Sequence, residues 1–182
     1  MPYLFLILAL LLGGCSSKEI YTLGDTSRIP QGTLSSTEVI AIETIKVPTY
    51  LKDSPIYIKA TPNHLIELDD AKWINSMETQ LTQSLINYLQ KVQNNPNVYT
   101  YPWENIHKPL DKKVTLTITS FIAYHNEVVL EGNYQISAPQ LDHSESHLFS
   151  LCEPLSKKDS EIVVQGMEKA FFRLASEINS KL

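Results

Sequence analysis

The segment VTLTITSFIAYHNEVVLEGNYQI, residues 114–136, contains two runs in which apolar and polar side chains alternate. Val114, Leu116 and Ile118 are separated by threonines, and the alternation returns between residues 128 and 136. A period of two is typical of strands with one buried and one solvated face. Because residues 124–127 provide a turn, the segment predicts an antiparallel hairpin. Gly132 predicts a bulge or a close backbone approach within it.

Shorter β-prone runs on both sides of this hairpin extend the predicted sheet. Residues 39–47 are apolar on both faces at first, which suits a central strand, and residues 146–152 follow the hairpin as a third strand. Residues 56–59 and 64–68 flank a turn-forming group and predict a second hairpin. Residues 20–23 and 98–103 predict two short strands, the former at a sheet edge.

Two segments have the periodicity of amphipathic helices. The first covers residues 72–93, with Asp69 and Asp70 placed before it as an N-cap and its neighbour, and the second covers about residues 158–181. Small residues at 166, 170 and 175 predict that the second helix lies close to the sheet. The fold class predicted is therefore α/β: a single-domain sandwich in which two long helices pack on a mixed, mostly antiparallel sheet of five to seven strands.

An apolar run, LFLILALLLGGC, occupies residues 4–15. It is shorter than the roughly 20 residues that span a bilayer, and it fits the apolar region of a secretory signal peptide. Leu12-Gly13-Gly14-Cys15 is similar to a bacterial lipobox, in which the chain is cut before a cysteine whose thiolate is alkylated by a lipid. A signal peptide normally carries positive charge before its apolar region, but no Lys or Arg precedes this run. The alternative is therefore that the run forms a buried N-terminal helix.

The predicted organisation is a lipoprotein signal peptide at residues 1–14, a lipidated Cys15 with a polar linker to residue 36, and one domain over residues 37–182. By resemblance to enteric lipoproteins, Ser16 in place of an aspartate favours anchoring in the outer membrane, facing the periplasm. With Cys15 acylated, Cys152 has no disulfide partner. The chain has 15 basic and 20 acidic side chains and a formal charge of −5, which argues against nucleic acid as a partner.

Catalytic motifs are not evident in the sequence, which has no nucleophile elbow, no phosphate-binding glycine loop and no HExxH motif. His143, Glu145 and His147 form a ligand-like cluster that holds zinc if the three side chains converge, and a solvated polar loop is the alternative. Asp69-Asp70 is either an acid/base pair or a helix cap. The sequence therefore favours a binding module over an enzyme and predicts no cofactor. Aromatic residues near turns are candidates for partner contacts, with the core as the alternative: Tyr50, Tyr57, Trp73, Tyr99, Tyr101 and Trp103.

Taken in order, these features resemble the ABC-type transport auxiliary lipoproteins, the PqiC/YmbA-like group. The family pattern runs from a lipobox cysteine through a Y-x-L segment, a strand ending in P-x-Y-L, a helix with a Trp near its start, a strand hairpin and a C-terminal helix rich in Ala and Leu. The corresponding residues here are Cys15, Tyr21-Thr22-Leu23, Val47-Pro48-Thr49-Tyr50-Leu51, Trp73, Thr119-Ser120-Phe121 with Val129-Leu130-Glu131-Gly132-Asn133-Tyr134, and 163–182.

This resemblance implies an outer-membrane-anchored docking subunit of an MCE-type system that transports lipids between membranes. Its implied partners are the membrane itself, an MCE-domain periplasmic protein, an inner-membrane permease and a second copy of the chain. We expect the partner surface at Pro48, Tyr50, Leu51 and Trp73. Two alternatives remain: a lipoprotein that assembles or stabilises an outer-membrane pore or secretion apparatus, and a periplasmic zinc hydrolase.

Overall fold

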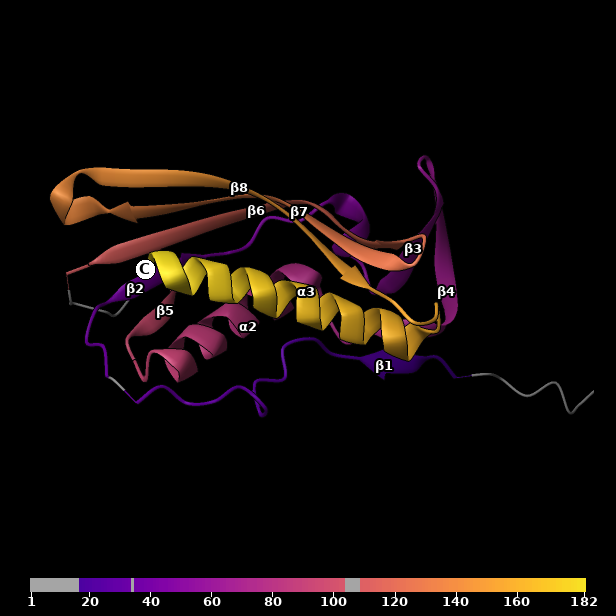
Figure 1. The fold of residues 1–182 in the computed structure, drawn as a ribbon, viewed down its shortest axis with the longest axis horizontal. Coiled ribbons are helices and arrows are strands. Elements are labelled where there is room, and N and C mark those ends of the chain that lie inside the picture. The colour runs from indigo at the N-terminus through magenta and orange to yellow at the C-terminus, as the bar shows by residue number, and fades with distance from the viewer. Residues whose placement is uncertain (1–16, 34, 104–108) are drawn as a thin grey trace, which may run out of the picture.

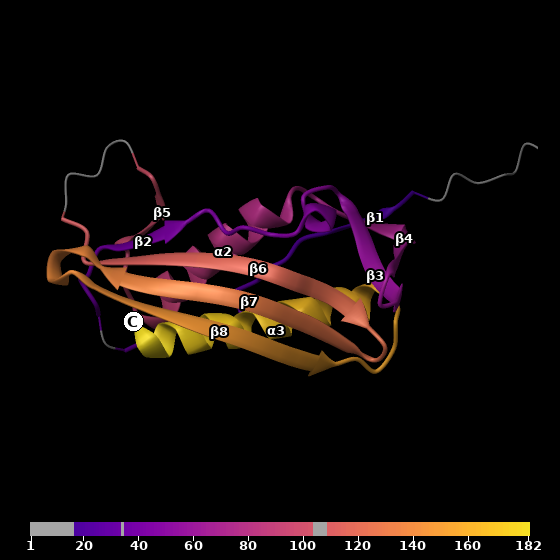
Figure 2. The same ribbon diagram turned by 90° about the horizontal axis from the view of Figure 1, so that it is seen from above.

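One face of a single sheet carries both helices, and the other face is open (Figures 1 and 2). The structure is a computed structural model that describes residues 17–33, 35–103 and 109–182; the predicted lipidation site at Cys15 lies outside these residues. The described elements are β1 (Glu19–Tyr21), β2 (Ile40–Glu43), the short 3-10 helix η1 (Thr49–Leu51), β3 (Pro55–Thr61), β4 (His64–Trp73), α2 (Met77–Val92), β5 (Val98–Tyr101), β6 (Lys112–Tyr124), β7 (Glu127–Ala138), η2 (Pro139–Leu141), β8 (His143–Pro154) and α3 (Ser160–Lys181).

β6 is the strand from which the sheet branches. One of its edges pairs with β7, and its other edge pairs with β2 near Lys112 and with β3 near Ala123. The sheet continues from β3 to β4 and β1, from β2 to β5, and from β7 to β8. Pairing is parallel for β1 with β4, β2 with β5 and β6, and β3 with β6, and antiparallel elsewhere. The predicted fold class is confirmed, with eight described strands where five to seven were expected.

The hairpin predicted from the alternating runs is formed by β6 and β7. Tyr124 pairs with Glu127, and His125 in the turn has a positive φ of 53°. Opposite Gly132 the register shifts between Ile118 and Ser120, and a Cβ on this glycine would lie 2.1 Å from the carbonyl oxygen of Thr117. Only glycine fits without a backbone shift, so the prediction of a bulge with a close approach is confirmed.

The first helix begins later than predicted. Residues 64–73 form one strand, β4, because β3 pairs with it on one side and β1 pairs with its end on the other. α2 starts at Met77 behind Ser76, whose hydroxyl accepts a hydrogen bond from the Thr79 amide. Asp70 instead accepts from the Ser160 hydroxyl at 2.7 Å. The prediction of Asp69 and Asp70 as the cap of a helix from residue 72 is therefore wrong.

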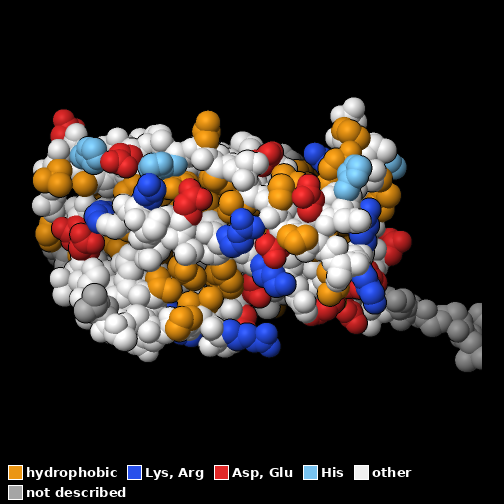
Figure 3. Space-filling view, in the orientation of Figure 1, with side chains coloured by type: hydrophobic (Ala, Val, Ile, Leu, Met, Phe, Trp, Pro, Cys, Tyr) orange, Lys and Arg blue, Asp and Glu red, His pale blue; other side chains and the backbone are white. Residues whose placement is uncertain are grey.

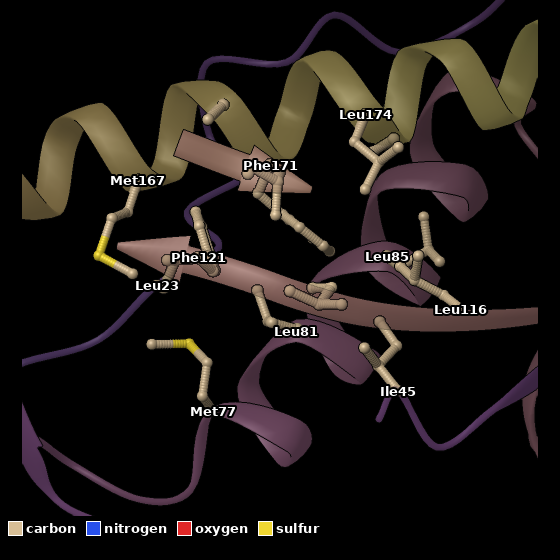
Figure 4. Packing of buried hydrophobic residues seen from close by; sticks show 14 of the residues in the cluster. Leu23, Ile45, Met77, Leu81, Leu85, Leu116, Phe121, Met167, Phe171 and Leu174 are labelled. Atoms are coloured by element: carbon tan, nitrogen blue, oxygen red, sulfur yellow. The ribbon is translucent and has the colours of Figure 1, made fainter. Parts of the chain in front are cut away.

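The core fills the space between the sheet and the two helices (Figure 4). Leu81 and Leu85 of α2 and Phe171 of α3 are fully buried there against the sheet. A Cβ at Gly166 would lie 2.5 Å from Cδ2 of Leu155, and Ala170 and Ala175 have no exposed surface. The predicted close approach of α3 through small residues is confirmed.

Residues 22–33, 35 and 36, which were expected to form part of a polar linker, lie on the domain. Leu23 is buried, and the amides of Gly24 and Asp25 both donate to Oε1 of Glu168 on α3. The Gly32 amide donates to the carbonyl of Lys91 in α2. Since β1 also pairs with β4 at a sheet edge, as predicted, the folded unit begins well before residue 37.

Candidate docking surface

The four residues expected to contact a partner come from two segments that the fold brings together. Pro48 to Leu51 form the entry and body of η1, which follows β2. The amide of Trp73, at the end of β4, donates to the carbonyl of Ser54 at 2.7 Å, just beyond this short helix. The two segments therefore lie next to each other in the fold.

Two of the four residues are nevertheless part of the core. Leu51 is 3% exposed and Trp73 is 1% exposed, so both side chains lie inside the fold, and a partner contact by these two residues stays a prediction. Trp73 occupies an inward position of β4, between the exposed Lys72 and the exposed Ile74. Its indole Nε1 has no hydrogen-bond partner among the described residues, so packing is what this side chain provides.

Tyr50 has a structural task and remains half-buried. Its hydroxyl accepts a hydrogen bond from the Phe121 amide at 3.0 Å. Phe121 lies on β6 between the point where Lys46 bridges Thr117 and the point where β3 begins to pair. Burial raises the pKa of the Tyr50 phenol. The side chain thus satisfies a main-chain donor that neither neighbouring strand reaches, and a partner contact by Pro48 and Tyr50 stays a prediction.

The His-Glu-His cluster lies at the start of β8 instead of in a loop. His143, Glu145 and His147 share one face of the strand, as the alternation predicted, and Glu145 lies between the two imidazoles at 3.1 and 3.5 Å. The hydrogen bond from His143 lowers the pKa of the Glu145 carboxyl. Because one carboxylate serves both rings, the side chains do not converge on a common point. Within the described ranges, no three His, Cys, Asp or Glu side chains are placed to hold a metal ion, so the geometry does not support the zinc-hydrolase hypothesis.

This cluster continues into the core through aromatic and carboxylate groups. The His147 ring stacks on Tyr134 of β7, with the centroids 4.9 Å apart. The Tyr134 hydroxyl donates to Oε1 of Glu177 on α3 at 2.9 Å. Burial, together with this carboxylate, raises the pKa of Tyr134 to about 12. These contacts hold β8, β7 and α3 together and so contribute to the packing of the fold.

A second group of aromatic residues is brought together at the edge strand β5. Tyr99, Tyr101 and Trp103 are all partly exposed, and the Trp103 ring packs edge-on against both tyrosines, at 6.1 and 5.5 Å between centroids. Nζ of Lys113 lies 4.7 Å from the Tyr101 ring centroid. We call these four residues the β5 aromatic cluster. The sequence signal was the spacing of two between Tyr99 and Tyr101, which places their rings on one face of β5; Trp103 lies two residues beyond the end of that strand.

The helix face of the molecule carries small apolar areas between charges of both signs (Figure 3). One shallow hollow of about 410 Å³ is lined by Ile29, Tyr88 and Phe172, the last two stacked at 5.6 Å, and is rimmed by Glu153 and Arg173. The hollow is open to solvent, so it offers a contact area and does not enclose a ligand. None of the helices in the described part of the chain is both long enough and apolar enough to span a bilayer.

The fold is a small α/β domain with a partly exposed aromatic group at one edge, and solved structures share its architecture. The chain is similar to an uncharacterised protein with a TM-score of 0.72 at 16% identity, over 91% of this chain and 98% of the other. It is also similar to a protein from Xanthomonas campestris with a TM-score of 0.70 at 16% identity, over 88% and 92% of the two chains. At this level of identity the likeness establishes the fold alone.

The sequence establishes the family. Residues 21–179 match the model of the ABC-type transport auxiliary lipoprotein component, and the chain belongs to this family. The resemblance noted from the ordered motifs is thereby confirmed. Among curated proteins, no sequence matches the chain significantly.

Proposed function

We propose that this chain is the lipid-anchored docking subunit of an ABC-type system that moves lipids between the inner and outer membranes. Membership of the auxiliary lipoprotein family, over residues 21–179, is the observation that carries this proposal. In it, acylated Cys15 holds the chain in the outer membrane, facing the periplasm, and the folded domain binds an MCE-domain protein that works with an inner-membrane permease. The chain itself performs no catalysis.

The short distance between the anchor and the sheet supports a docking role. β1 begins at Glu19, four residues after Cys15, and four residues of fully extended backbone reach at most about 14 Å. Gly24, Asp25 and Gly32, which follow β1, are hydrogen-bonded to α2 and α3 and do not lengthen this tether. The domain is therefore held against the bilayer, where a partner meets it at a fixed place.

The β5 aromatic cluster is the contact surface we propose in place of Leu51 and Trp73. Partly exposed Tyr and Trp side chains dominate protein interfaces because they bury much area with few rotatable bonds. Lys113 beside Tyr101 also pairs with Oε1 of Glu43 at 3.3 Å, which fixes the lysine at the surface. Pro48 and Tyr50 remain secondary candidates for the same partner.

Two variants of the full chain test this proposal in the envelope. Cys15→Ser is expected to leave the protein in the soluble fraction and to abolish lipid transport, since the anchor is lost. Trp103→Ala is expected to keep the protein membrane-bound but to reduce recovery of the MCE-domain protein in pull-downs at least tenfold. Leu141→Ala, which removes another exposed apolar side chain, is the matched control and should recover the partner normally.

Distinct outcomes would contradict each part of the proposal. A Cys15→Ser chain that stays membrane-bound and active contradicts the anchor. Equal recovery of the MCE-domain protein with Trp103→Ala and with Leu141→Ala contradicts the β5 surface. Recovery of an outer-membrane β-barrel, without any MCE-domain protein, would favour the role in a pore or secretion apparatus.

A further inference from the structure

The large apolar side chains that the described residues expose are not spread evenly over the molecule. Five of them reach the surface: Ile20, Ile66, Ile74, Leu141 and Leu148. The three isoleucines lie on β1, on β4 or directly after β4, and these two strands make up only a short part of the chain. β1 is also the first described element after the predicted anchor at Cys15. The end of the sheet next to the anchor therefore carries most of these side chains.

Two of the isoleucines share the face of the sheet that is turned away from the core. In the parallel pairing of β1 with β4, Ile20 stands opposite Lys72, and Tyr21 stands opposite the buried Trp73. Paired residues point to the same side and successive residues to opposite sides, so Ile20 and Lys72 point outward. The Ile74 amide donates to the Tyr21 carbonyl at 2.9 Å, which continues the pairing by one residue. Ile74 thus lies on the same side as Ile20, and both are 61% exposed.

We call Ile20, Lys72 and Ile74 the β1–β4 patch, in which the lysine stands between the two isoleucines. No ion pair of the described residues involves Lys72. A lysine in such a setting lays its aliphatic stem along the apolar side chains and keeps its ammonium group in a polar layer. β1 and β4 together carry more acids than bases, so the patch does not select anionic lipid. Its contact with a partner is mainly apolar.

The predicted anchor brings this patch to a bilayer. Acyl chains on Cys15 lie in the hydrocarbon, which holds residue 15 at the level of the lipid headgroups. Ile20 follows five residues later, at most about 18 Å away along fully extended backbone. A tether this short keeps the patch beside the bilayer at a high effective concentration, so a small apolar area is enough for lasting contact.

We propose that the β1–β4 patch rests on the bilayer that anchors the chain, with Ile20 and Ile74 in the interfacial layer and the Lys72 ammonium group at the lipid phosphates. The proposal rests on the acylated Cys15 of the proposed function and adds an orientation to it. β1 and β5 lie toward opposite ends of the long axis in both views (Figures 1 and 2). With the β1 end on the membrane, the β5 aromatic cluster points away from it, toward a partner in the periplasm.

Quenching by brominated lipids tests the contact. The reporter is a fluorophore on Lys72→Cys in the acylated full chain, in phosphatidylcholine vesicles with bromine on the acyl chains. The exposed Cys152 is changed to Ser so that it does not react with the label. Leu141→Cys, also exposed, is the reference: it lies in η2, which follows β7 at the end where Ser137 pairs with Lys113 of the β5 aromatic cluster. The label at position 72 should be quenched about threefold more than the label at position 141, since it alone enters the interface.

Replacing the isoleucines tests whether they make the contact. With the label at position 72, the double variant Ile20→Ser and Ile74→Ser should lower the quenching to the level of the label at position 141. Leu148→Ser removes an exposed apolar side chain outside the patch and is the matched control, so it should leave the quenching unchanged. Circular dichroism verifies that these variants keep the fold.

Flotation of the labelled chain with the vesicles separates this inference from the proposed function. A chain that does not float has no working anchor, which contradicts both. A chain that floats, but whose label at position 72 is quenched no more than the label at position 141, overturns the membrane contact and leaves the anchor in place. Quenching that survives the loss of both isoleucines would overturn the contact as well. Quenching that is lost with Leu148→Ser would assign the membrane contact to a different face.

Discussion

The two halves of the sheet are built in different ways. β6, β7 and β8, which we call the meander, are consecutive strands of 12 or 13 residues that pair antiparallel with their neighbours in sequence. β1 to β5, which we call the crossing half, are strands of three to ten residues, and most of their pairings are parallel. The meander is thus held by local main-chain pairing, whereas the crossing half depends on side chains that hold distant segments together.

Trp73 is the clearest example of such a side chain. It pairs with Tyr21, some fifty residues earlier, and its amide bonds to Ser54. It is the largest of the fully buried side chains, while Ile74 next to it is 61% exposed. If the comparison between the halves is right, these adjacent residues differ greatly in their contribution to stability.

The largest effect is therefore expected for Trp73→Ala. Removing this buried ring should lower the free energy of unfolding by about 3–5 kcal/mol, whereas Ile74→Ala should change it by less than about 0.5 kcal/mol. Trp73→Phe should cost less than Trp73→Ala, because the indole N–H makes no hydrogen bond within the described structure. Chemical denaturation of the three variants measures the difference. Equal losses for Trp73→Ala and Ile74→Ala would show that the crossing half does not depend on the core at this point.

The same contrast explains how far the fold could be predicted from the sequence. The β6–β7 hairpin of the meander was predictable because its period of two and its turn lie within residues 114–136. Parallel pairings such as Ile42 with Thr100 leave no local pattern, so the order of the crossing half could not be predicted. Asp69 and Asp70 resemble a helix cap, but the pairing of β4 with β1 and β3 overrides this local preference.

The candidate site shows the same limits. The spacing of Tyr99 and Tyr101 places their rings on one face of β5, which was visible in the sequence, whereas the packing of Trp103 against them occurs beyond the end of the strand. The burial of Trp73 was not visible in the sequence. Trp73 is buried because of its position on β4, which pairs with β1, a strand far away in the chain. The exposed Leu148 occupies a solvent-facing position of β8, which no apolar pattern distinguishes from a core position.

A smaller effect, and a sharper test of the meander, comes from proline at two adjacent exposed positions of β8. The Leu155 amide donates to the Asn126 carbonyl and β8 stays in register with β7, so the Glu145 amide faces β7, whereas the Ser146 amide faces the edge of β8 that no described strand pairs with. Glu145→Pro should therefore lower the free energy of unfolding by about 1–3 kcal/mol, and Ser146→Pro by clearly less, because only the first removes a ladder hydrogen bond. Glu145→Ala, measured by the same denaturation experiment, accounts for the lost side chain. A greater cost for Ser146→Pro would reverse the assignment of the open edge.

The smallest effect compares the halves through two tyrosines at high pH. Burial with the Glu177 carboxylate raises the pKa of Tyr134 in the meander to about 12, and the hydrogen bond to Glu19 raises that of Tyr21 in the crossing half to about 12 as well. Because folding raises both pKa values, each phenol stabilises the protein below its unfolded pKa of about 10, and this stabilisation is lost as the pH rises toward about 12.

In the natural chain the free energy of unfolding should decrease between about pH 10 and pH 12. Tyr134→Phe and Tyr21→Phe should each make this decrease smaller, as measured by denaturation at a series of pH values. Tyr134→Phe should have the larger effect, because the Tyr134 side chain is fully buried while Tyr21 is partly exposed and screened by water. At pH 8 Tyr134→Phe is expected to lower the free energy of unfolding by about 1 kcal/mol, the contribution of one hydrogen bond. A larger flattening with Tyr21→Phe would mean that β1, the shortest strand of the crossing half, is held more firmly than its three residues imply.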